Sequence, residues 1–416
     1  MATHEPTVDT ARALADLQEL RRLTEDSAGA QRVAWTDTWT AARDWLLAQL
    51  KEIDGVSVDR DQAGNIWATG PGDSERSVII GGHLDSVPNG GWLDGALGTV
   101  AGLEILRTLA PERRALTIKL VDWADEEGAR FGRSLFGSSA VAGTLDPDAV
   151  RGLTDREGTT LADAVSAHGV DLDRAHEARG RLRDAAAYLE LHIEQGPVLE
   201  RMDLPLGVVL GTFGVQRHAV CFTGAHAHAG ATPMDLRHDA FLAAARSALA
   251  FRDDAAERDD VRATTGIVKV SPGIVTAFNG TCELSLDQRA LDGDVLDQML
   301  AAARSASERL AGEEGCEVAW ERRWEIEPVP FHAELIEMAE AVVCKVAGQS
   351  HRLPSGPLHD AAEMARALPT VMLFVKSIGG VSHTKAEDSA PEDVEMSVRV
   401  LHELAGQTLA WAREQA

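Results

Sequence analysis

The stretch GGHLDSVPNGGWLDG, residues 81–95, begins within an apolar run at 77–82 and is followed by a helical pattern at 98–109. The apolar run predicts a buried strand, and the imidazole of His83 and the carboxylate of Asp85 come at its end. The glycines of this stretch let backbone or a ligand approach closely. In an open α/β sheet, ligands bind in the crevice beyond the carboxyl ends of the strands. We therefore expect a ligand site at this strand end.

Acidic residues follow a second predicted strand. The run LTIKLVDW at 116–123 is strand-like, and Asp125, Glu126 and Glu127 come just after it. Three adjacent acids at a buried strand end would repel one another unless cations offset their charge. A solvated charge run is the alternative, but the apolar strand before the acids and Gly128 after them favour a site. An imidazole and carboxylates at two strand ends are what a two-metal hydrolytic site requires.

The order of the patterns predicts the fold class. A helical pattern at 38–50, strand-like runs at 187–193 and 370–375 and a long C-terminal helix continue the alternation. Strands that alternate with helices predict an α/β domain whose mostly parallel sheet carries helices on both faces. We expect the polar, unevenly helical stretch 146–184 to be an elaboration of this domain.

The pattern changes between 212 and 326, where four strands and two helices suit a small α+β domain with helices on one face of its sheet. The expected strands are 215–222, 264–270, 281–289 and 316–324, and the expected helices are 236–251 and 295–310. Because the α/β pattern resumes afterwards, we expect this domain to be inserted into a discontinuous one made of 1–211 and 327–416.

Size and composition limit the class of protein. With 416 residues, the chain exceeds what one hydrophobic core usually supports, so two domains are expected. The formal net charge of -26 argues against nucleic acid or an anionic membrane as the main partner; a well-solvated surface explains it better than a halophilic one. Four scattered cysteines without a CxxC pair indicate reduced thiols. We read no secretory signal and no apolar run of membrane-span length, so a cytoplasmic protein is expected.

Individual residues at these strand ends fit a metal centre. Positions two apart in an extended segment point the same way, so Asp85 is placed to accept the second ring N–H of His83. Asp94 is either the N-cap of the next helix or a carboxylate that bridges two cations, and its place after the His-x-Asp pair favours the bridge. His192 and His383 add imidazoles, the first at a strand end and the second in a glycine-containing loop. With one glutamate, these residues give two cations enough N and O ligands, with positions left for water.

Three further features bear on the chemistry. Of Glu126 and Glu127, one is expected to bind metal while the other, facing the cleft, takes a proton from water. The inserted domain carries His226 and His228 in TGAHAHAGATPM; this pair suggests metal, but its place in the other domain favours an imidazole that donates to an oxyanion. Arg289, ending LSLDQR, suits a substrate carboxylate or, equally, a surface ion pair.

Long motifs in a fixed order resemble those of a known family. They are AARDWLLAQLKEI at 41–53, GGHLDSVPNGGWLDGALGTVAGLEIL at 81–106, DWADEEGARFGRSLFGSSAVAG at 122–143, LHIEQGPVLE at 191–200, HAGATPMDLRHDA at 228–240, PSGPLHDAAEMA at 354–365 and SIGGVSHTKAED at 377–388. The chain resembles the metal-dependent amidases of the M20 metallopeptidase superfamily, in the branch of N-carbamoyl-L-amino-acid hydrolases, β-ureidopropionases and allantoate amidohydrolases. The similarity covers nearly all of the chain.

The resemblance implies a two-metal catalytic domain and an inserted domain that acts as a lid and forms a homodimer. His83, Asp94 and His192 would hold one divalent metal ion, and Asp94, Glu127 and His383 the other. Glu126 is implied as the general base and Asp85 as the residue that orients His83. Zinc is the expected metal, with manganese, cobalt or nickel as ions that the same N and O ligands accept.

The resemblance also implies substrate contacts. His228 resembles the lid histidine that reaches the oxyanion, and four further positions match substrate contacts of this branch: Gln195, Gln216, Arg289 and Gly356. Two positions depart from the branch pattern. Ala227 stands where the branch commonly has an asparagine, and Thr276 stands where it commonly has the asparagine of an Asn-Val-Ile-Pro-Gly run. These departures leave the substrate side chain open.

We therefore expect a metal-dependent amidohydrolase that cleaves the carbamoyl C–N bond of an N-carbamoyl-L-amino acid to give the amino acid, carbon dioxide and ammonia. An allantoate or other ureido-acid amidohydrolase is the alternative, followed by a dipeptidase. His192 argues against the dipeptidase, because the aminopeptidase members of the superfamily usually have a carboxylate there. A catalytically silent binder with the same fold is the last alternative, and the presence of Glu126 and of every ligand argues against it.

Overall fold

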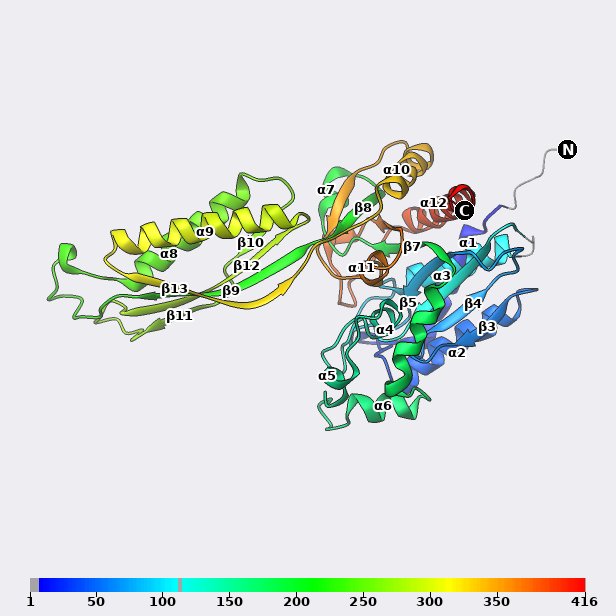
Figure 1. The fold of residues 1–416 in the computed structure, drawn as a ribbon, viewed down its shortest axis with the longest axis horizontal. Helices are drawn as coiled ribbons and strands as arrows, with labels where there is room; N and C mark the ends of the chain where they lie inside the picture. The colour runs from blue at the N-terminus through cyan, green and yellow to red at the C-terminus, as the bar shows by residue number, and fades with distance from the viewer. Residues whose placement is uncertain (1–6, 111–113, 416) are drawn as a thin grey trace. The chain divides into compact units, whose positions relative to one another are not determined.

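The computed structural model describes residues 7–110 and 114–415. The chain divides into two compact units, the first made of Met1–Leu210 and Phe331–Ala416 and the second of Gly211–Pro330. The sequence patterns had suggested 212–326 for the second unit. Each unit is built around its own sheet, as Figure 1 shows.

Within the described residues, the larger sheet has nine strands in the order β14-β8-β16-β7-β5-β6-β4-β3, with β15 beside β8. Its central strands β16, β7, β5 and β6 are parallel to one another, whereas β8 and β4 pair antiparallel on either side of them. The strands are β3 (Ser57–Arg60), β4 (Ile66–Thr69), β5 (Ser77–His83), β6 (Thr117–Trp123), β7 (Ala185–Ile193), β8 (Leu206–Thr212), β14 (Val329–Pro330), β15 (Arg352–Ser355) and β16 (Thr370–Val375).

The central strands are buried on both faces. Every residue of β5 and of β16 is buried, and successive side chains of a strand point to opposite faces, so helices must cover both sides. The helices that pack on these strands are α3 (Ala96–Leu109), α10 (Ala333–Ala347), α11 (Asp360–Ala365) and α12 (Pro391–Glu414). The predicted α/β class, with a mostly parallel central sheet, is confirmed.

The remaining elements of the first unit surround this sheet. They are α1 (Thr10–Thr24), the hairpin of β1 (Glu25–Asp26) and β2 (Gly29–Ala30), α2 (Asp37–Lys51), α4 (Phe136–Ala142), α5 (Pro147–Arg151), α6 (Leu161–Ala167), the 3-10 helix η1 (Leu172–Leu182), α7 (Val198–Met202) and the 3-10 turn η3 (Ile378–Gly380). The polar stretch 146–184 thus forms three short helices. Polar N-caps begin all three, because Asp146 accepts the N–H of Asp148, Thr160 accepts that of Asp163 and Asp171 accepts that of Asp173.

The second unit has one antiparallel sheet with strand order β10-β12-β9-β13 and β11 beside β12. Its strands are β9 (Gly214–Thr223), β10 (Arg262–Thr264), β11 (Val268–Ser271), β12 (Thr281–Ala290) and β13 (Glu317–Ile326); its helices are α8 (Ala240–Ala256), α9 (Gly293–Glu313) and the turn η2 (Met234–Leu236). Buried and partly exposed residues alternate along β12, and α8 and α9 pack on the sheet. One face of the sheet is therefore the core of this unit.

Two predicted elements of the second unit were wrong in detail. The strand expected at 264–270 is divided into β10 and β11, because the hydroxyl of Ser285 accepts the N–H groups of Gly266 and Ile267 and holds a bend between them. The helix expected from Leu236 begins at Ala240, because Asp239 caps it by accepting the N–H of Phe241.

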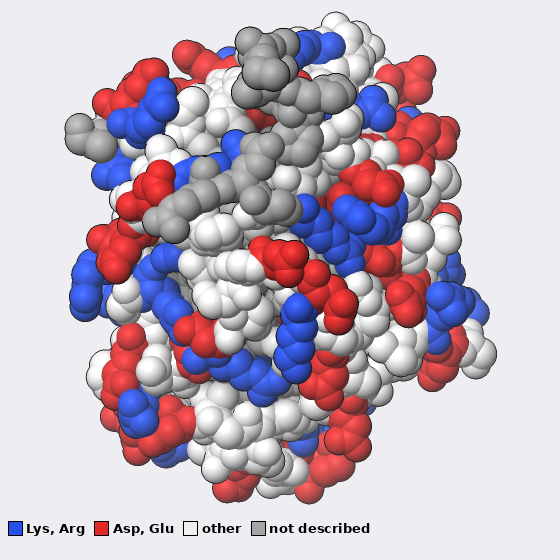
Figure 2. Space-filling view, turned by 90° about the vertical axis from the view of Figure 1, so that its right-hand side faces the viewer, with Lys and Arg blue, Asp and Glu red and all other residues white. Residues whose placement is uncertain are grey.

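The surface carries both signs of charge. On the face of the molecule drawn in Figure 2, lysine and arginine side chains are interspersed with aspartate and glutamate and do not gather into one basic patch. Such mixing suits a solvated surface. The described helices include none that is long and apolar enough to cross a membrane.

Candidate metal centre

Five ionisable side chains gather at the carboxyl ends of the central parallel strands. His83 ends β5, and His192 lies next to the last residue of β7. Asp94 lies in the loop between β5 and α3, Glu127 follows β6, and His383 follows η3 after β16. Because these strands are parallel neighbours, their ends bring residues that are distant in sequence into one small volume.

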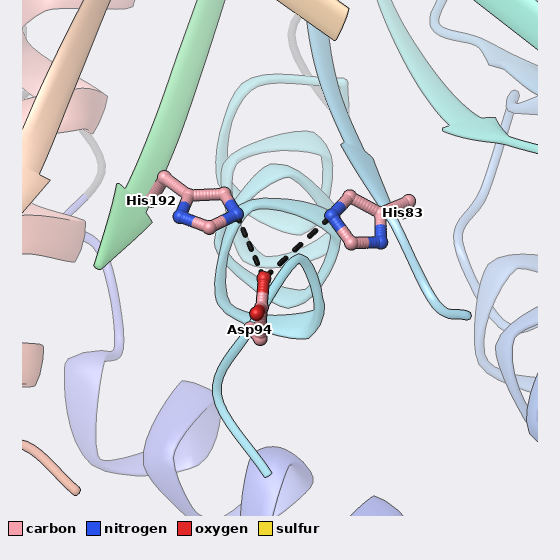
Figure 3. A group of neighbouring side chains, drawn as sticks. All are labelled: His83, Asp94 and His192. Atoms are coloured by element: carbon pink, nitrogen blue, oxygen red, sulfur yellow. Dashed lines mark ion pairs between the residues drawn. The ribbon is translucent and has the colours of Figure 1, made fainter. Parts of the chain in front are cut away.

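His83, Asp94 and His192 form the first group. His192 Nε2 lies 3.0 Å and His83 Nε2 lies 3.8 Å from the same oxygen, Asp94 Oδ1. Figure 3 shows the two rings approaching this carboxylate from separate strands. The candidate ligand atoms lie within 4.8 Å of one another, so small side-chain movements would bring them around one cation.

Asp94, Glu127 and His383 form the second group, which shares the aspartate with the first. His383 Nε2 lies 3.3 Å from Asp94 Oδ2 and 3.4 Å from Glu127 Oε2. The two oxygens of Asp94 therefore face different groups. Asp94 does not cap α3, because the N-cap is Gly95 and no side chain supplies the capping bond. Its carboxylate is thus placed as a bridge between the groups.

The backbone here adopts conformations that side chains rarely take. Gly95 has a φ of +64°, and a Cβ at this position would lie 2.2 Å from the His83 ring. Three non-glycine residues of the site, Asp125, Gln195 and His383, have φ of 59°, 58° and 58°. Such left-handed residues cost free energy and persist where surrounding contacts hold them. Their clustering is typical of a functional site.

Asp85 joins the ends of β5 and β6. Its backbone oxygen lies 3.1 Å and its carboxylate 3.5 Å from His83 Nδ1, so both acceptors face the second ring nitrogen. The same carboxylate accepts the N–H of Glu126 at 3.2 Å and that of Glu127 at 3.0 Å. Asp85 therefore fixes the loop that carries the two glutamates as well as the ring of His83.

Glu126 faces the same cavity as the two groups. Its Oε2 lies 3.7 Å from His83 Nε2, and its side chain is largely buried. The cavity measures about 250 Å³ and is lined by Asp94, Glu126, Glu127, Ser134, His192, Gln195, Pro357, Leu358, His359 and His383. A carboxylate beside two groups of N and O donors is positioned to exchange a proton with a molecule bound there.

Burial and crowding shift the titration of these acids. Burial raises the pKa of Glu126 well above its ordinary value, and it raises the pKa of Glu127 to about 7, assisted by Asp94. Burial, assisted by Asp85, raises the pKa of Asp125 to about 8. Burial also opposes ionisation of Asp94, but hydrogen bonds from His192 and His383 outweigh it and hold its pKa well below the ordinary value. Divalent cations would offset this concentration of negative charge.

Sequence reasoning missed several residues of the site. Glu387 is 1% exposed and accepts the N–H of Asp94 at 3.0 Å. Ser382 donates to Glu387 at 2.6 Å, and its Oγ lies 3.2 Å from Asp94 Oδ2. The His359 ring lies 4.4 Å from that of His192, and burial holds its pKa well below the ordinary value, so the ring is neutral. The signals were present: Glu387 and Ser382 lie in SIGGVSHTKAED, and His359 lies in PSGPLHDAAEMA.

Two expected substrate contacts belong to the first unit. Gln195 Nε2 donates to Asp94 Oδ2 at 2.9 Å and to Ser382 Oγ at 3.2 Å, so its amide lies against the shared aspartate. Gly356 precedes the cavity residues Pro357 and Leu358 and is itself exposed, and a Cβ at this position would meet no atom within 4 Å.

Three expected residues belong to the second unit. Gln216 in β9 donates to Asp297 and Glu325. Arg289 in β12 pairs with Asp287 at 2.8 Å, the surface ion pair that the sequence had left as an alternative. His228 is exposed, and its Nδ1 accepts the N–H groups at 230 and 231. The neutral His228 ring therefore carries its proton on Nε2, which leaves a donor free for an oxyanion.

A protein-family comparison identifies the class. The family model described as peptidase family M20/M25/M40 matches residues 79–407. The chain belongs to this family, as its motifs predicted, and is a hydrolase; the prediction of an enzyme is confirmed.

Named relatives and solved structures agree with this assignment. The chain is 38% identical over 384 residues to a protein named N-carbamoyl-L-amino acid amidohydrolase from Geobacillus stearothermophilus, covering 91% of this chain and 93% of that protein. It is 31% identical to the allantoate amidohydrolase of Escherichia coli K12, covering 94% and 95%. A crystal structure of an amidase of the hydantoinase/carbamoylase family from Burkholderia multivorans is 32% identical, with a TM-score of 0.86 and coverage of 97% and 98%. The resemblance to this branch of amidases is therefore confirmed.

Proposed function

We propose that this chain is a metal-dependent amidohydrolase that cleaves the carbamoyl C–N bond of an N-carbamoyl-L-amino acid. The observation that carries the proposal is the sharing of Asp94 between two groups of donors, with Glu126 beside them. The identity to a named N-carbamoyl-L-amino acid amidohydrolase supports the substrate class. The products would be the amino acid, carbon dioxide and ammonia.

Two divalent cations fit the donor set. His83 and His192 would hold one cation, Glu127 and His383 the other, and Asp94 would bridge them. When bound, such cations activate water and polarise a carbonyl group. Imidazole and carboxylate ligands accept zinc, manganese, cobalt or nickel, and zinc is the metal we propose.

The remaining side chains would handle protons and charge. Asp85 and the Glu126 N–H keep the glutamate loop beside His83. The Glu126 carboxylate would take a proton from the attacking water and deliver it to the leaving nitrogen, a transfer favoured by a pKa that burial raises well above its ordinary value. His228 would donate from Nε2 to the developing oxyanion, and Arg289 would receive the α-carboxylate of the substrate. Gln195, Gln216 and Gly356 would complete the substrate contacts.

An allantoate or other ureido-acid amidohydrolase is the second candidate, supported by the identity to the Escherichia coli relative. One local feature bears on this choice. Both departures from the branch pattern lie in paired segments: Ala229 donates to the carbonyl of Thr276, and Phe278 donates to that of Ala227. Ala227 and Thr276 therefore change one continuous patch next to His228, the patch expected to select the substrate.

The test is ammonia release from a panel of N-carbamoyl-L-amino acids, their D-enantiomers, allantoate and dipeptides, with the metal content measured on the same sample. Fastest turnover of an N-carbamoyl-L-amino acid supports the proposal. Fastest turnover of allantoate would establish the second candidate. Turnover of dipeptides alone, or of no substrate by a protein that contains two metal ions per chain, would refute both.

We further propose a cytoplasmic homodimer that forms through the second unit. Strand β11 lies at the edge of its sheet with every residue exposed, and Val268, Val270 and Val275 near this edge are large exposed apolar residues. An apolar, unpaired strand edge is suited to pairing with a second copy. The four cysteines are free thiols, as expected in a reducing compartment. Sedimentation of the wild type and of Val268→Lys would test the interface, because a monomeric wild type contradicts it.

A further inference from the structure

The first unit contains a second cavity, separate from the metal centre. It measures about 340 Å³ and lies between α2, the turn from β3 to β4 and the segment that joins α6 to η1. None of its lining residues lines the metal-centre cavity. The lining residues are Trp35, Trp39, Thr40, Arg43, Arg60, Asp61, Gly64, Ala167, His168, Gly169 and Val170.

Aromatic rings form one wall of this cavity, which we call the tryptophan pocket. The ring centroids of Trp35 and Trp39 are 4.8 Å apart, and the His168 ring meets both at 5.7 Å in edge-to-face geometry. His168 Nδ1 lies 2.9 Å from the carbonyl of Ala164, so the ring has a fixed orientation. Both indoles are 2% exposed. The two indole planes are tilted by 60° to one another, so this wall is rigid and apolar and offers both ring faces and ring edges to the apolar body of a planar ligand.

Two arginines, Arg43 and Arg60, bring positive charge to the tryptophan pocket. The Arg43 guanidinium lies 4.4 Å from the centre of the Trp39 ring and bonds Asp122 through Nε. Arg60 is exposed at the end of β3, and no carboxylate within the described residues pairs with it. Both arginines line this pocket, and the charge of Arg60, after the larger effect of burial, lowers the pKa of Arg43. Two like charges that line one pocket favour an anion between them.

Asp61, the carboxylate that lines the pocket, forms no ion pair with Arg43 or Arg60 within the described residues. Asp61 accepts four hydrogen bonds, from the backbone N–H groups of Ala63 and Asn65 and from the side chains of Asn65 and Trp67. Its oxygens are therefore occupied by the turn before β4. In the same wall, the buried Nε1–H of Trp39 has no acceptor within the described residues. The pocket thus combines the charge of Arg60, which no carboxylate of the described residues pairs, with the Trp39 Nε1–H donor, which lacks an acceptor there.

We propose that the tryptophan pocket binds a small carboxylate with a planar apolar body, at a site distinct from the metal centre. The body would pack on Trp35 and Trp39, and the carboxylate would face Arg60 and Arg43. The volume suits a ligand at the small end of the usual range. The inference does not depend on the proposed function.

The pocket also touches the loop of the metal centre. Trp35 Nε1 donates to Asp125 Oδ2 at 2.7 Å, and Asp125 immediately precedes Glu126. Both Trp35 and Asp125 have left-handed backbones, with φ of 63° and 59°. A ligand that packs on Trp35 therefore contacts the side chain whose hydrogen bond to Asp125 holds the loop that carries Glu126.

Benzoate is a suitable probe, with neutral benzamide and cationic benzamidine as isosteric controls. Binding is measured by calorimetry on the full chain after its metal ions have been removed, so that the metal centre offers no cation to a carboxylate. We expect one benzoate per chain, at least tenfold weaker binding of both controls and at least tenfold weaker benzoate binding by Arg60→Gln. Arg399→Gln, which changes an exposed arginine of α12, is the matched control and keeps the wild-type affinity.

Indole N–H signals in an NMR spectrum locate the probe, once Trp→Phe variants have assigned them. Benzoate should shift the signals of Trp35 and Trp39 and leave that of Trp92, next to the metal centre, unchanged. Equal affinity of Arg60→Gln, equal binding of benzamide, absence of benzoate binding or a shift of Trp92 alone would each overturn the proposal.

Discussion

Glu387 Oε1 accepts the backbone N–H of Asp94 at 3.0 Å, so a residue from the end of the chain holds the carboxylate that the two donor groups share. The same oxygen accepts the N–H of Leu93 at 3.2 Å. Through Ser382, Glu387 is also connected to Asp94 Oδ2. Glu387 thus fixes both the backbone and the side chain of Asp94, which makes it a positioning residue for the metal centre.

Replacing Glu387 should weaken metal binding without unfolding the protein. Glu387→Ala removes three hydrogen bonds around Asp94, and loss of such supporting contacts typically lowers metal affinity by about 10–100-fold. Glu387→Gln keeps an oxygen acceptor and should retain more of the affinity. Metal affinity is measured by competition with a chelator, and Glu392→Gln, an exposed acid of the following helix, serves as control. Wild-type affinity of Glu387→Ala would contradict the assigned role.

Substitutions of Glu126 and of Glu127 should have different effects, the first on turnover and the second on metal binding. Glu126→Gln removes the proton-transfer group, and its turnover should fall by about 10²–10⁴-fold or more while two metal ions remain bound. Glu127→Gln removes a proposed ligand and should lose metal from the second group. Metal content and ammonia release are measured on the same preparations. Equal turnover by Glu126→Gln would refute this glutamate as the base.

The sequence predicted the parts of the site that lie at strand ends. His83 and His192 end apolar runs long enough to be recognised as strands, and parallel neighbours must align their carboxyl ends. Glu387 escaped prediction because it acts through backbone N–H groups nearly three hundred residues earlier in the chain, a pairing that no local pattern encodes. The division of the strand expected at 264–270 escaped for a similar reason, since the bend depends on Ser285 from a neighbouring strand.

Metal removal should destabilise the protein more at high pH than at low pH. In the metal-free protein, burial raises the pKa of Glu127 from 4.5 to about 7, and the hydrogen bond to Asp94 raises that of His383 from 6.5 to about 9. Groups whose pKa is raised by folding bind extra protons in the folded state, so their stabilisation is lost as pH rises through about 4.5–7 and about 6.5–9. Metal binding favours the deprotonated ligands over the same range.

The measurement is thermal unfolding of dialysed metal-free and metal-loaded protein at several values between about pH 6 and pH 9. The difference in Tm between the two forms should widen as pH rises. A difference that stays constant or narrows would mean that these two groups do not carry the linkage.

The buried ion pair between Arg43 of α2 and Asp122 of β6 should contribute strongly to the free energy of unfolding. Arg43 Nε donates to Asp122 Oδ2 at 2.7 Å, and Asp122 Oδ1 accepts the N–H of Leu84 at 2.9 Å. Asp122→Asn leaves the guanidinium buried without its charge partner, which costs about 3–5 kcal/mol. Asp59→Asn, which breaks an exposed pair with Arg181, should change the free energy of unfolding by at most about 1 kcal/mol. Urea denaturation compares the two variants, and equal costs would contradict the prediction.

Trp35→Phe should lower turnover without removing metal, because it deletes one hydrogen bond and keeps an aromatic ring. The Trp35 ring packs edge-to-face on Phe136 at 5.6 Å, a contact that phenylalanine partly retains. The lost bond leaves Asp125 held through Oδ1, which accepts the N–H of Gly128 at 3.1 Å. Loss of a hydrogen-bond partner of a buried carboxyl costs about 1–3 kcal/mol. Because the left-handed backbone conformation of Asp125 itself costs free energy, the loop would then relax toward another conformation.

We therefore expect kcat of Trp35→Phe to fall by about tenfold, because a small displacement of the loop that carries Glu126 disturbs proton transfer more than binding. KM and metal content should stay near those of the wild type. Trp39→Phe, which alters the neighbouring indole but no bond to Asp125, is the matched control and should leave kcat unchanged. An equal fall in kcat for both variants would show that ring packing, and not the hydrogen bond to Asp125, positions the glutamate loop.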